Sequence, residues 1–213
     1  MKPFIFACTV CIVLLFASCA STNSASTYSL VETTEDTAAI ETRISYPQFD
    51  AVPELSAQIA QYVQRTYPPF KADAQKFNLD YADSALQYQF LVSSTITEDD
   101  TFIAVLLNTY TYSAGAHGST ELTSFVWNKK TGSLQTIEQA SGLSYAHIAQ
   151  QCRAELRKRS ISSDEQWIMQ GTQPDAEHFG TFTIHNKRLT VYFAEYQVAP
   201  YAAGIQSVSI DVQ

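Results

Sequence analysis

The run at residues 101–112 (TFIAVLLNTYTY) places apolar side chains on both faces of an extended segment, which is typical of a central strand covered on each side. The run at 86–97 alternates apolar and polar residues, as a half-buried strand does. Two further strand-like runs follow at 121–127 and 133–137, and short polar turns separate all four. Four strands in quick succession predict a mainly antiparallel sheet.

Two helical patterns flank these strands. The first opens at Pro53, and we expect Tyr67-Pro68-Pro69 to end it, with a further turn or two over 70–77. The second follows an N-cap at Ser144 and carries Cys152 on its core-facing stripe, where a free thiol behaves as a small buried hydrophobe. Residues 164–171 extend the helical region. The remaining strands are expected at 39–46 (ended by Pro47), 179–184, 189–193 and 205–212. This order predicts the α+β class, with a mainly antiparallel sheet and two principal helices packed on it.

The N-terminus has the pattern of a secretory signal peptide. Lys2 precedes an apolar run that ends in Ala17-Ser18-Cys19-Ala20, and this run is shorter than the roughly 20 residues that a membrane span needs. Small residues before a cysteine are typical of a bacterial lipobox, although Phe16 stands where Leu is usual. We predict a lipoprotein signal peptide over residues 1–19, ending at an acylated Cys19 that holds the chain on a lipid bilayer. Ordinary cleavage after Ala20 is the alternative.

Removal of the signal peptide leaves Cys152 as the one unmodified cysteine, so no intramolecular disulfide is expected. Residues 20–38 are rich in Ser and Thr and poor in large apolar groups, which predicts a flexible tether. Residues 39–213 are then a single α+β domain, with an N-terminal half at 39–100 and a C-terminal half at 101–213.

Charge and motifs exclude several classes of function. The formal net charge is −8, and the one basic cluster, 153–159, lies late in a predicted helix, where cations complement the helix dipole. We therefore expect no nucleic-acid partner. Outside the predicted signal peptide, which carries Cys8 and Cys11, the sequence contains no His-Glu-x-x-His, Cys-x-x-Cys or Gly-x-Ser-x-Gly motif, so we expect no metal, no cofactor and no catalytic residue.

His117 is the best-placed candidate for chemistry. It stands between Gly115 and Gly118, and glycines can bring backbone amides and an imidazole to one point. A sharp turn or bulge between two strands would explain the same glycines. Because the sequence shows no acidic or nucleophilic companion, we expect this segment to be structural rather than catalytic.

Four motifs together resemble one known family. They are YSAGAHG at 112–118, FVWNKKTG at 125–132, LTVYF at 189–193 and YQVAPYAAG at 196–204. They resemble the RsiV-type extracellular domain, which also occurs at the N-terminus of some bacterial peptidoglycan deacetylases and in many lipoproteins. The resemblance covers the chain from about residue 40 to its end. Ala114 stands where that family usually has glycine, and Ser119 where Asn is common.

The resemblance implies an RsiV-like α+β fold. It also marks a set of binding or fold-signature residues, which are Tyr112, His117, Gly118, Tyr196, Pro200 and Tyr201. The best-understood member of the family is a membrane-anchored anti-sigma factor that binds lysozyme. We expect neither sigma-factor binding nor deacetylase catalysis here, since the sequence shows no sigma-binding segment, no transmembrane helix and no appended catalytic domain.

We therefore predict a non-enzymatic lipoprotein of the bacterial cell envelope, periplasmic or surface-exposed. Its domain is expected to bind peptidoglycan or a lysozyme-like protein, and the acidic balance would favour encounter with a cationic lysozyme. The alternative is a cell-wall-modifying hydrolase with a pocket around His117, Tyr112 and Tyr201.

Overall fold

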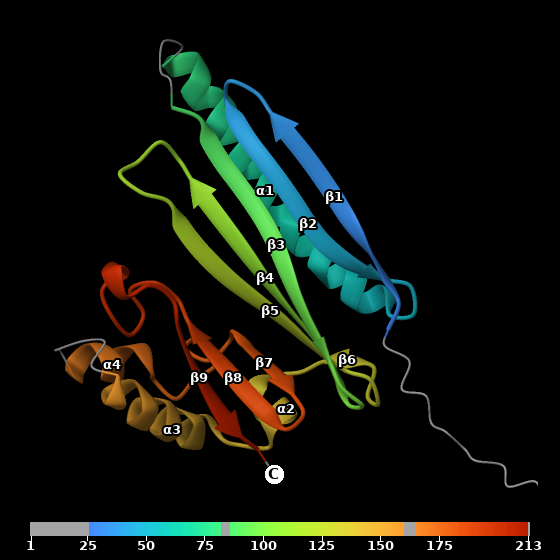
Figure 1. Cartoon of the computed structure of the whole chain (residues 1–213), viewed down its shortest axis with the longest axis vertical. Coiled ribbons are helices and arrows are strands. Elements are labelled where there is room, and N and C mark those ends of the chain that lie inside the picture. Colours follow the sequence, from blue (N-terminus) through green and yellow to red (C-terminus); the bar gives the residue numbers. More distant parts are fainter. Residues whose placement is uncertain (1–25, 82–85, 160–164, 213) are drawn as a thin grey trace, which may run out of the picture.

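The computed structural model describes residues 26–81, 86–159 and 165–212, which fold into two β-sheets with helices packed against them (Figure 1). In chain order the elements are β1 (Tyr28–Asp36), β2 (Ile40–Phe49), α1 (Pro53–Asp80), β3 (Tyr88–Glu98), β4 (Phe102–Tyr112), β5 (Ser119–Asn128), β6 (Ser133–Leu134), α2 (Ile137–Ser141), α3 (Tyr145–Lys158), α4 (Glu165–Gly171), β7 (Phe182–His185), β8 (Arg188–Phe193), the 3₁₀ helix η1 (Tyr201–Ala203) and β9 (Gln206–Asp211).

The larger sheet has six strands in the order β1-β2-β3-β4-β5-β6, and the smaller has three in the order β7-β8-β9. Neighbouring strands are antiparallel except β2 and β3, which are parallel and are connected by the crossover helix α1. Helix α1 packs on the larger sheet and α3 on the smaller. The predicted α+β class, with a mainly antiparallel sheet and two principal helices, is confirmed.

Helix α1 continues through Pro68 and Pro69, so the prediction that Tyr67-Pro68-Pro69 ends the helix is wrong. Both prolines are exposed, and the rings beside them pack on the sheet. The ring centroids of Tyr67 and Phe70 lie 5.2 and 5.3 Å from that of Phe90 in β3. These aromatic contacts offset the backbone hydrogen bonds that proline removes, and the helix therefore reaches Asp80.

Strand β1 shows that residues 28–36, part of the flexible tether predicted over 20–38, are instead paired in the larger sheet. Its nine residues pair along their whole length with β2. Glu35 accepts hydrogen bonds from Tyr67 Oη (2.8 Å) and Lys71 Nζ (2.5 Å), and both oxygens of Glu98 accept bonds from Ser26 (2.7 and 2.8 Å). Composition misses such a strand because backbone pairing and polar contacts, rather than apolar burial, hold it. The predicted signal peptide, with Cys19, lies outside the described residues.

Strand β2 runs past Pro47 to Phe49, although Pro47 was expected to end it. Residues Ile40 to Ile44 pair with β3, whereas Pro47 has its register partner, Leu30, on β1. Proline lacks a backbone donor and is tolerated where one side of a strand needs no hydrogen bond. The strand expected at 133–137 is shorter than predicted. It is β6, which ends at Leu134, and Thr136 already caps α2.

Two hydrophobic cores share strands β4 and β5. Ile103 and Val105 belong to the core under α1, whereas Phe102 and Ala104 belong to the core between the larger sheet, β7–β9 and α3. The predicted halves, 39–100 and 101–213, therefore do not correspond to separate cores. Cys152 is fully buried in the second core, as expected, and burial raises the pKa of its thiol to about 12.

Among the described residues, no helix combines the length and the apolar character that a membrane crossing requires.

The polar contacts of β1 predict that this strand loosens first in acid. The hydrogen bonds from Lys71 and Tyr67 lower the pKa of Glu35. Desolvation opposes ionisation of Glu98, but the hydrogen bonds from Lys129 and Ser26 outweigh it and lower its pKa also. A carboxylate whose pKa is lowered on folding stabilises the fold above its unfolded pKa, about 4.3 for Glu, and this stabilisation is lost as the pH falls through the folded value.

Hydrogen exchange, corrected for intrinsic rates, should therefore show β1 amides losing protection below about pH 4 before those of β4. Glu35→Gln keeps an acceptor but removes the charge, so this variant should show a weaker pH dependence in β1. Equal loss of protection in β1 and β4 at every pH would contradict the account.

Candidate functional site

Two predicted motifs, far apart in the sequence, meet at one end of the larger sheet. The first is the β4–β5 hairpin tip at 113–118, and the second is the loop 194–205 between β8 and β9, which contains η1 (Figure 1). The rings of His117 and Tyr201 stack with centroids 4.2 Å apart and an interplanar angle of 28°. Tyr201 Oη donates a hydrogen bond to the carbonyl oxygen of Gly118 at 3.0 Å. The chain therefore joins its two motifs by ring stacking and a hydrogen bond.

The tautomer of His117 follows from its hydrogen bond. Its Nδ1 lies 2.8 Å from the carbonyl oxygen of Gly118. A carbonyl oxygen can only accept, so Nδ1 carries the proton and Nε2 is the acceptor nitrogen in the neutral ring. The same carbonyl accepts from Tyr201, so both of its lone pairs are used.

The second motif begins with a strained residue, Tyr196, whose φ is +66°. Left-handed backbone is unfavourable for a bulky side chain and persists only where neighbouring contacts hold it. Trp167 Nε1 donates to the carbonyl of Tyr196 at 2.6 Å. Tyr196 is 55% exposed, and its ring centroid lies 5.5 Å from that of Tyr201. We call His117, Tyr196 and Tyr201 the aromatic cluster.

Gln197 and Glu195 fix the loop that carries this cluster. Gln197 Oε1 accepts from the backbone of Ala194, and its Nε2 donates to the carbonyls of Gly171 and His178, at distances of 2.9 to 3.0 Å. Glu195 accepts from Ser119 Oγ and from the backbone of Thr120, at 3.3 and 3.4 Å. The carboxylate is therefore engaged with the start of β5 rather than with His117.

Desolvation raises the pKa of the Tyr201 phenol, and the nearby Glu195, Tyr110 and Tyr196 add to this effect. The hydroxyl therefore stays protonated at neutral pH and can donate to Gly118.

The two glycines of the first motif have different roles. A Cβ added to Gly118 would lie 2.3 Å from Tyr110 Oη, so glycine is needed for the close approach of the Tyr110 ring. A Cβ at Gly115 would approach nothing closer than 3.9 Å. The left-handed position of the hairpin tip is instead Ala114, with φ +59°, where the resembling family usually has glycine.

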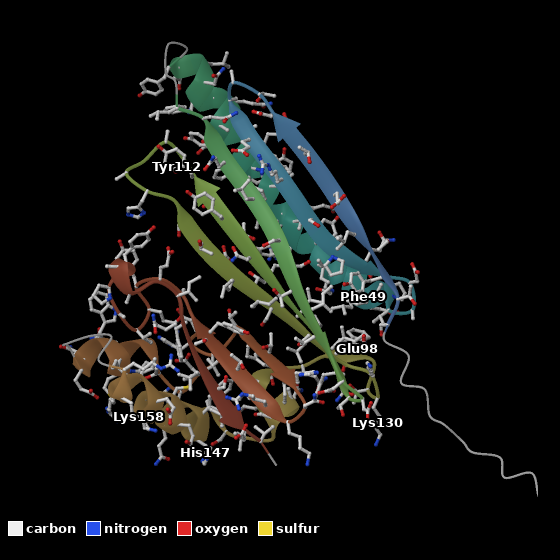
Figure 2. The ribbon with its side chains drawn as sticks, viewed as in Figure 1. Phe49, Glu98, Tyr112, Lys130, His147 and Lys158 are labelled. Carbon is white, nitrogen blue, oxygen red and sulfur yellow. The ribbon has the colours of Figure 1, made fainter. Side chains whose placement is uncertain are left out.

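The structure brings together four of the predicted site residues, His117, Gly118, Tyr196 and Tyr201. Pro200 immediately precedes η1, and its carbonyl accepts the N–H of Ala203 at 2.9 Å. Tyr112 is the last residue of β4, opposite Gln89 of β3, at the end of the sheet that carries the hairpin tip (Figure 2). Their binding role stays a prediction.

Sequence reasoning missed Tyr110, Trp167, Glu195 and Gln197. Gln197 stands inside a recognised motif and could have been proposed from it. The other three contact the site through tertiary packing, which no local pattern signals. Within the described ranges, no group of three or more His, Cys, Asp and Glu side chains gathers as metal ligands do.

We predict that Gly118→Ala destabilises the fold by about 1–3 kcal/mol, because the new methyl group would collide with Tyr110. Gly115→Ala is the matched control and should change the free energy of unfolding by less than about 0.5 kcal/mol. Urea denaturation measures both. Equal effects of the two variants would show that the Tyr110 contact is not what requires a glycine.

Two family models match different parts of the chain. The model described as "Deacetylase PdaC" matches residues 33–120, and the model described as "Protein of unknown function (DUF3298)" matches residues 139–213. His117 and Gly118 belong to the first stretch, and Tyr196 and Tyr201 to the second. The aromatic cluster therefore lies where the two matched regions touch. Both models are related to the RsiV-type family that the motifs resemble, although neither bears its name.

One curated relative is the peptidoglycan-N-acetylmuramic acid deacetylase PdaC of Bacillus subtilis (strain 168). It is 31% identical over 112 residues, which are 51% of this chain and 24% of the relative. The matched region thus spans about a quarter of the length of that protein.

Two solved structures share the fold. A DUF3298 family protein from Pseudomonas aeruginosa PAO1 has a TM-score of 0.60 at 14% identity, covering 88% of this chain and 91% of its own. A DUF3298 family member from Bacteroides fragilis NCTC 9343 has a TM-score of 0.57 at 15% identity, covering 88% and 90%. At these identities the likeness concerns the fold alone.

Proposed function

We propose that this protein is a membrane-anchored lipoprotein of the bacterial cell envelope whose RsiV-type domain binds peptidoglycan without catalysing a reaction. The observation that carries the proposal is the aromatic cluster, an exposed tyrosine beside a stacked His117–Tyr201 pair, held where the two motifs meet.

The chemistry of the cluster suits a glycan. A sugar ring presents a face of C–H groups that packs on an aromatic ring, while its hydroxyl groups need hydrogen-bond partners. Tyrosine and histidine offer both an apolar face and a polar edge. The contacts of Trp167 and Gln197 fix the loop beforehand, so binding costs little ordering entropy.

Similarity supports the cell envelope as the location. The relative in Bacillus subtilis is named for its action on peptidoglycan, and the model named for PdaC matches the stretch that contains His117. Since the match covers about a quarter of that protein, we carry over the cell-wall context and not its catalysis.

Binding is favoured over hydrolysis by the surroundings of His117. Among the described residues, its ring nitrogens have one hydrogen-bond partner, the carbonyl of Gly118. The carboxylate of Glu195, the residue before Tyr196, bonds to Ser119 and Thr120. A general base needs hydrogen-bond contact with the group that it activates or that orients it, and this arrangement supplies no such pair.

The N-terminal end of the described chain fits an anchor on the side away from the cluster. Ser26 is bound by Glu98 at one end of β3, and Tyr112 lies at the opposite end of the sheet (Figure 2). Gln89 of β3 is the register partner of Tyr112. Nine residue steps along β3, or about 30 Å, separate Gln89 from Glu98. An acyl group on Cys19 would therefore leave the cluster facing outward.

Mass spectrometry of the mature protein should find a chain that begins at Cys19 and carries the mass of a diacylglyceryl group. Cys19→Ala should abolish this modification. A mature chain that begins at Ser21 without lipid would contradict the anchor and leave the binding proposal standing.

Sedimentation with insoluble peptidoglycan tests the binding function. Tyr196→Ala should weaken binding about tenfold, since one aromatic contact contributes roughly 1–1.5 kcal/mol. Tyr81→Ala is the matched control and should bind as the wild type does. Tyr81 is also an exposed tyrosine, but it caps the C-terminal end of α1, far in sequence from both motifs.

Absence of binding by the wild type, or equal binding by the Tyr196 variant, would overturn the proposal. Capture of lysozyme in place of peptidoglycan would make a cationic protein the partner. Release of acetate or reducing sugar that His117→Ala abolishes would favour the hydrolase.

A further inference from the structure

One face of the larger sheet is covered at one end and open at the other. Side chains alternate along β4, and those of Ile103, Val105 and Leu107 enter the core under α1. On the opposite face, Phe102 and Ala104 are buried in the second core, beneath β7–β9. Beyond them on this face come Leu106, Asn108, Tyr110 and Tyr112. Figure 1 shows the smaller sheet over only one end of β4 and β5.

The open part of this face carries no charged side chain on β3 or β4. The register places four residues of β3 opposite four of β4, as the pairs Gln89–Tyr112, Leu91–Tyr110, Ser93–Asn108 and Thr95–Leu106. Ser93, Thr95 and Asn108 are exposed, and the other five side chains are half-buried. We call these eight residues the uncharged strip.

The border of the strip on β2 is an ion pair that neutralises itself. Arg43 Nη2 lies 2.8 Å from Glu41 Oε1, and Gln89 Nε2 donates to Glu41 Oε2 at 2.8 Å. The strip is therefore neutral in a chain of net charge −8.

The strip continues directly into the aromatic cluster. The Tyr110 ring packs against Gly118, whose carbonyl binds both Tyr201 and His117. Residues Leu106 to Tyr112 span six residue steps, or about 20 Å. Strip and cluster therefore adjoin at Gly118, and the strip alone is longer than a single sugar.

We infer that the uncharged strip binds successive units of a neutral, N-acetylated glycan chain whose first contact is the aromatic cluster. This inference rests on the proposed binding function and adds that the ligand is a polymer rather than a single sugar. The hydroxyl group of Ser93 and the amide group of Asn108 pair with the acetamido and hydroxyl groups of the glycan. The half-buried tyrosines pack on the faces of its sugar rings. A protein of net charge −8 would attract a cationic polyamine sugar, but the eight residues of the strip include no carboxylate, and the bordering Glu41 is already paired with Arg43.

Calorimetric titration with N-acetylglucosamine oligomers, from the dimer to the hexamer, tests this inference. The wild type should bind the hexamer at least tenfold more tightly than the dimer. Asn108→Ala and Tyr112→Ala should remove most of this gain and leave dimer affinity unchanged, whereas Tyr196→Ala should weaken binding at every length. Ser29→Ala, an exposed strand residue on β1, is the control. Thermal unfolding checks each fold, and Asn108 is exposed enough for its variant to remain folded if Tyr112→Ala does not.

The outcomes separate the two proposals. Equal affinity for dimer and hexamer, with loss in the Tyr196 variant, would overturn the strip and retain the cluster as the binding site. Absence of binding at every length would overturn the glycan ligand for both. Tighter, salt-sensitive binding of de-N-acetylated oligomers would contradict selection of a neutral ligand.

Discussion

The carbonyl oxygen of Gly118 is the point on which the arrangement of the candidate site depends. It accepts from Tyr201 of one motif and from His117 of the other, while the absence of a side chain at this position admits the Tyr110 ring. The three contacts link the sheet under α1 to the loop that closes the second core. A side chain at this position would collide with the Tyr110 ring and so disturb both contacts of the carbonyl oxygen.

The sharing of two strands between two cores explains why an open surface exists at all. β4 and β5 are long enough to bury one face under α1 and to lend only part of the other face to β7–β9. The uncovered remainder must tolerate water, and a surface of tyrosines, amides and hydroxyls does so while remaining suitable for a sugar. Fold and proposed function thus come from one geometric fact, the unequal cover of the two faces.

Local patterns in the sequence predicted the fold class, the central strand at 101–112 and the cap at Ser144, because periodicity and capping act within a few residues. They missed β1, which is held by pairing with β2 and by the contacts of Glu35 and Glu98, and they ended α1 at prolines that distant aromatic rings make tolerable. At the site, both motifs were recognised, yet their contact and the part played by Tyr110 depend on tertiary packing. The left-handed backbone of Ala114 at the hairpin tip is a further example, because this conformation favours glycine and an alanine gives no reason to expect it.

Chemical-shift mapping with the N-acetylglucosamine hexamer tests the central claim most directly, because it locates the ligand without a substitution. We predict shifts that concentrate at His117, Gly118, Tyr196, Tyr201 and along the uncharged strip of β3 and β4. Shifts that concentrate instead around the cavity of about 430 Å³ between β2 and α1, lined by Phe49, Pro53 and Ala57, would contradict the account.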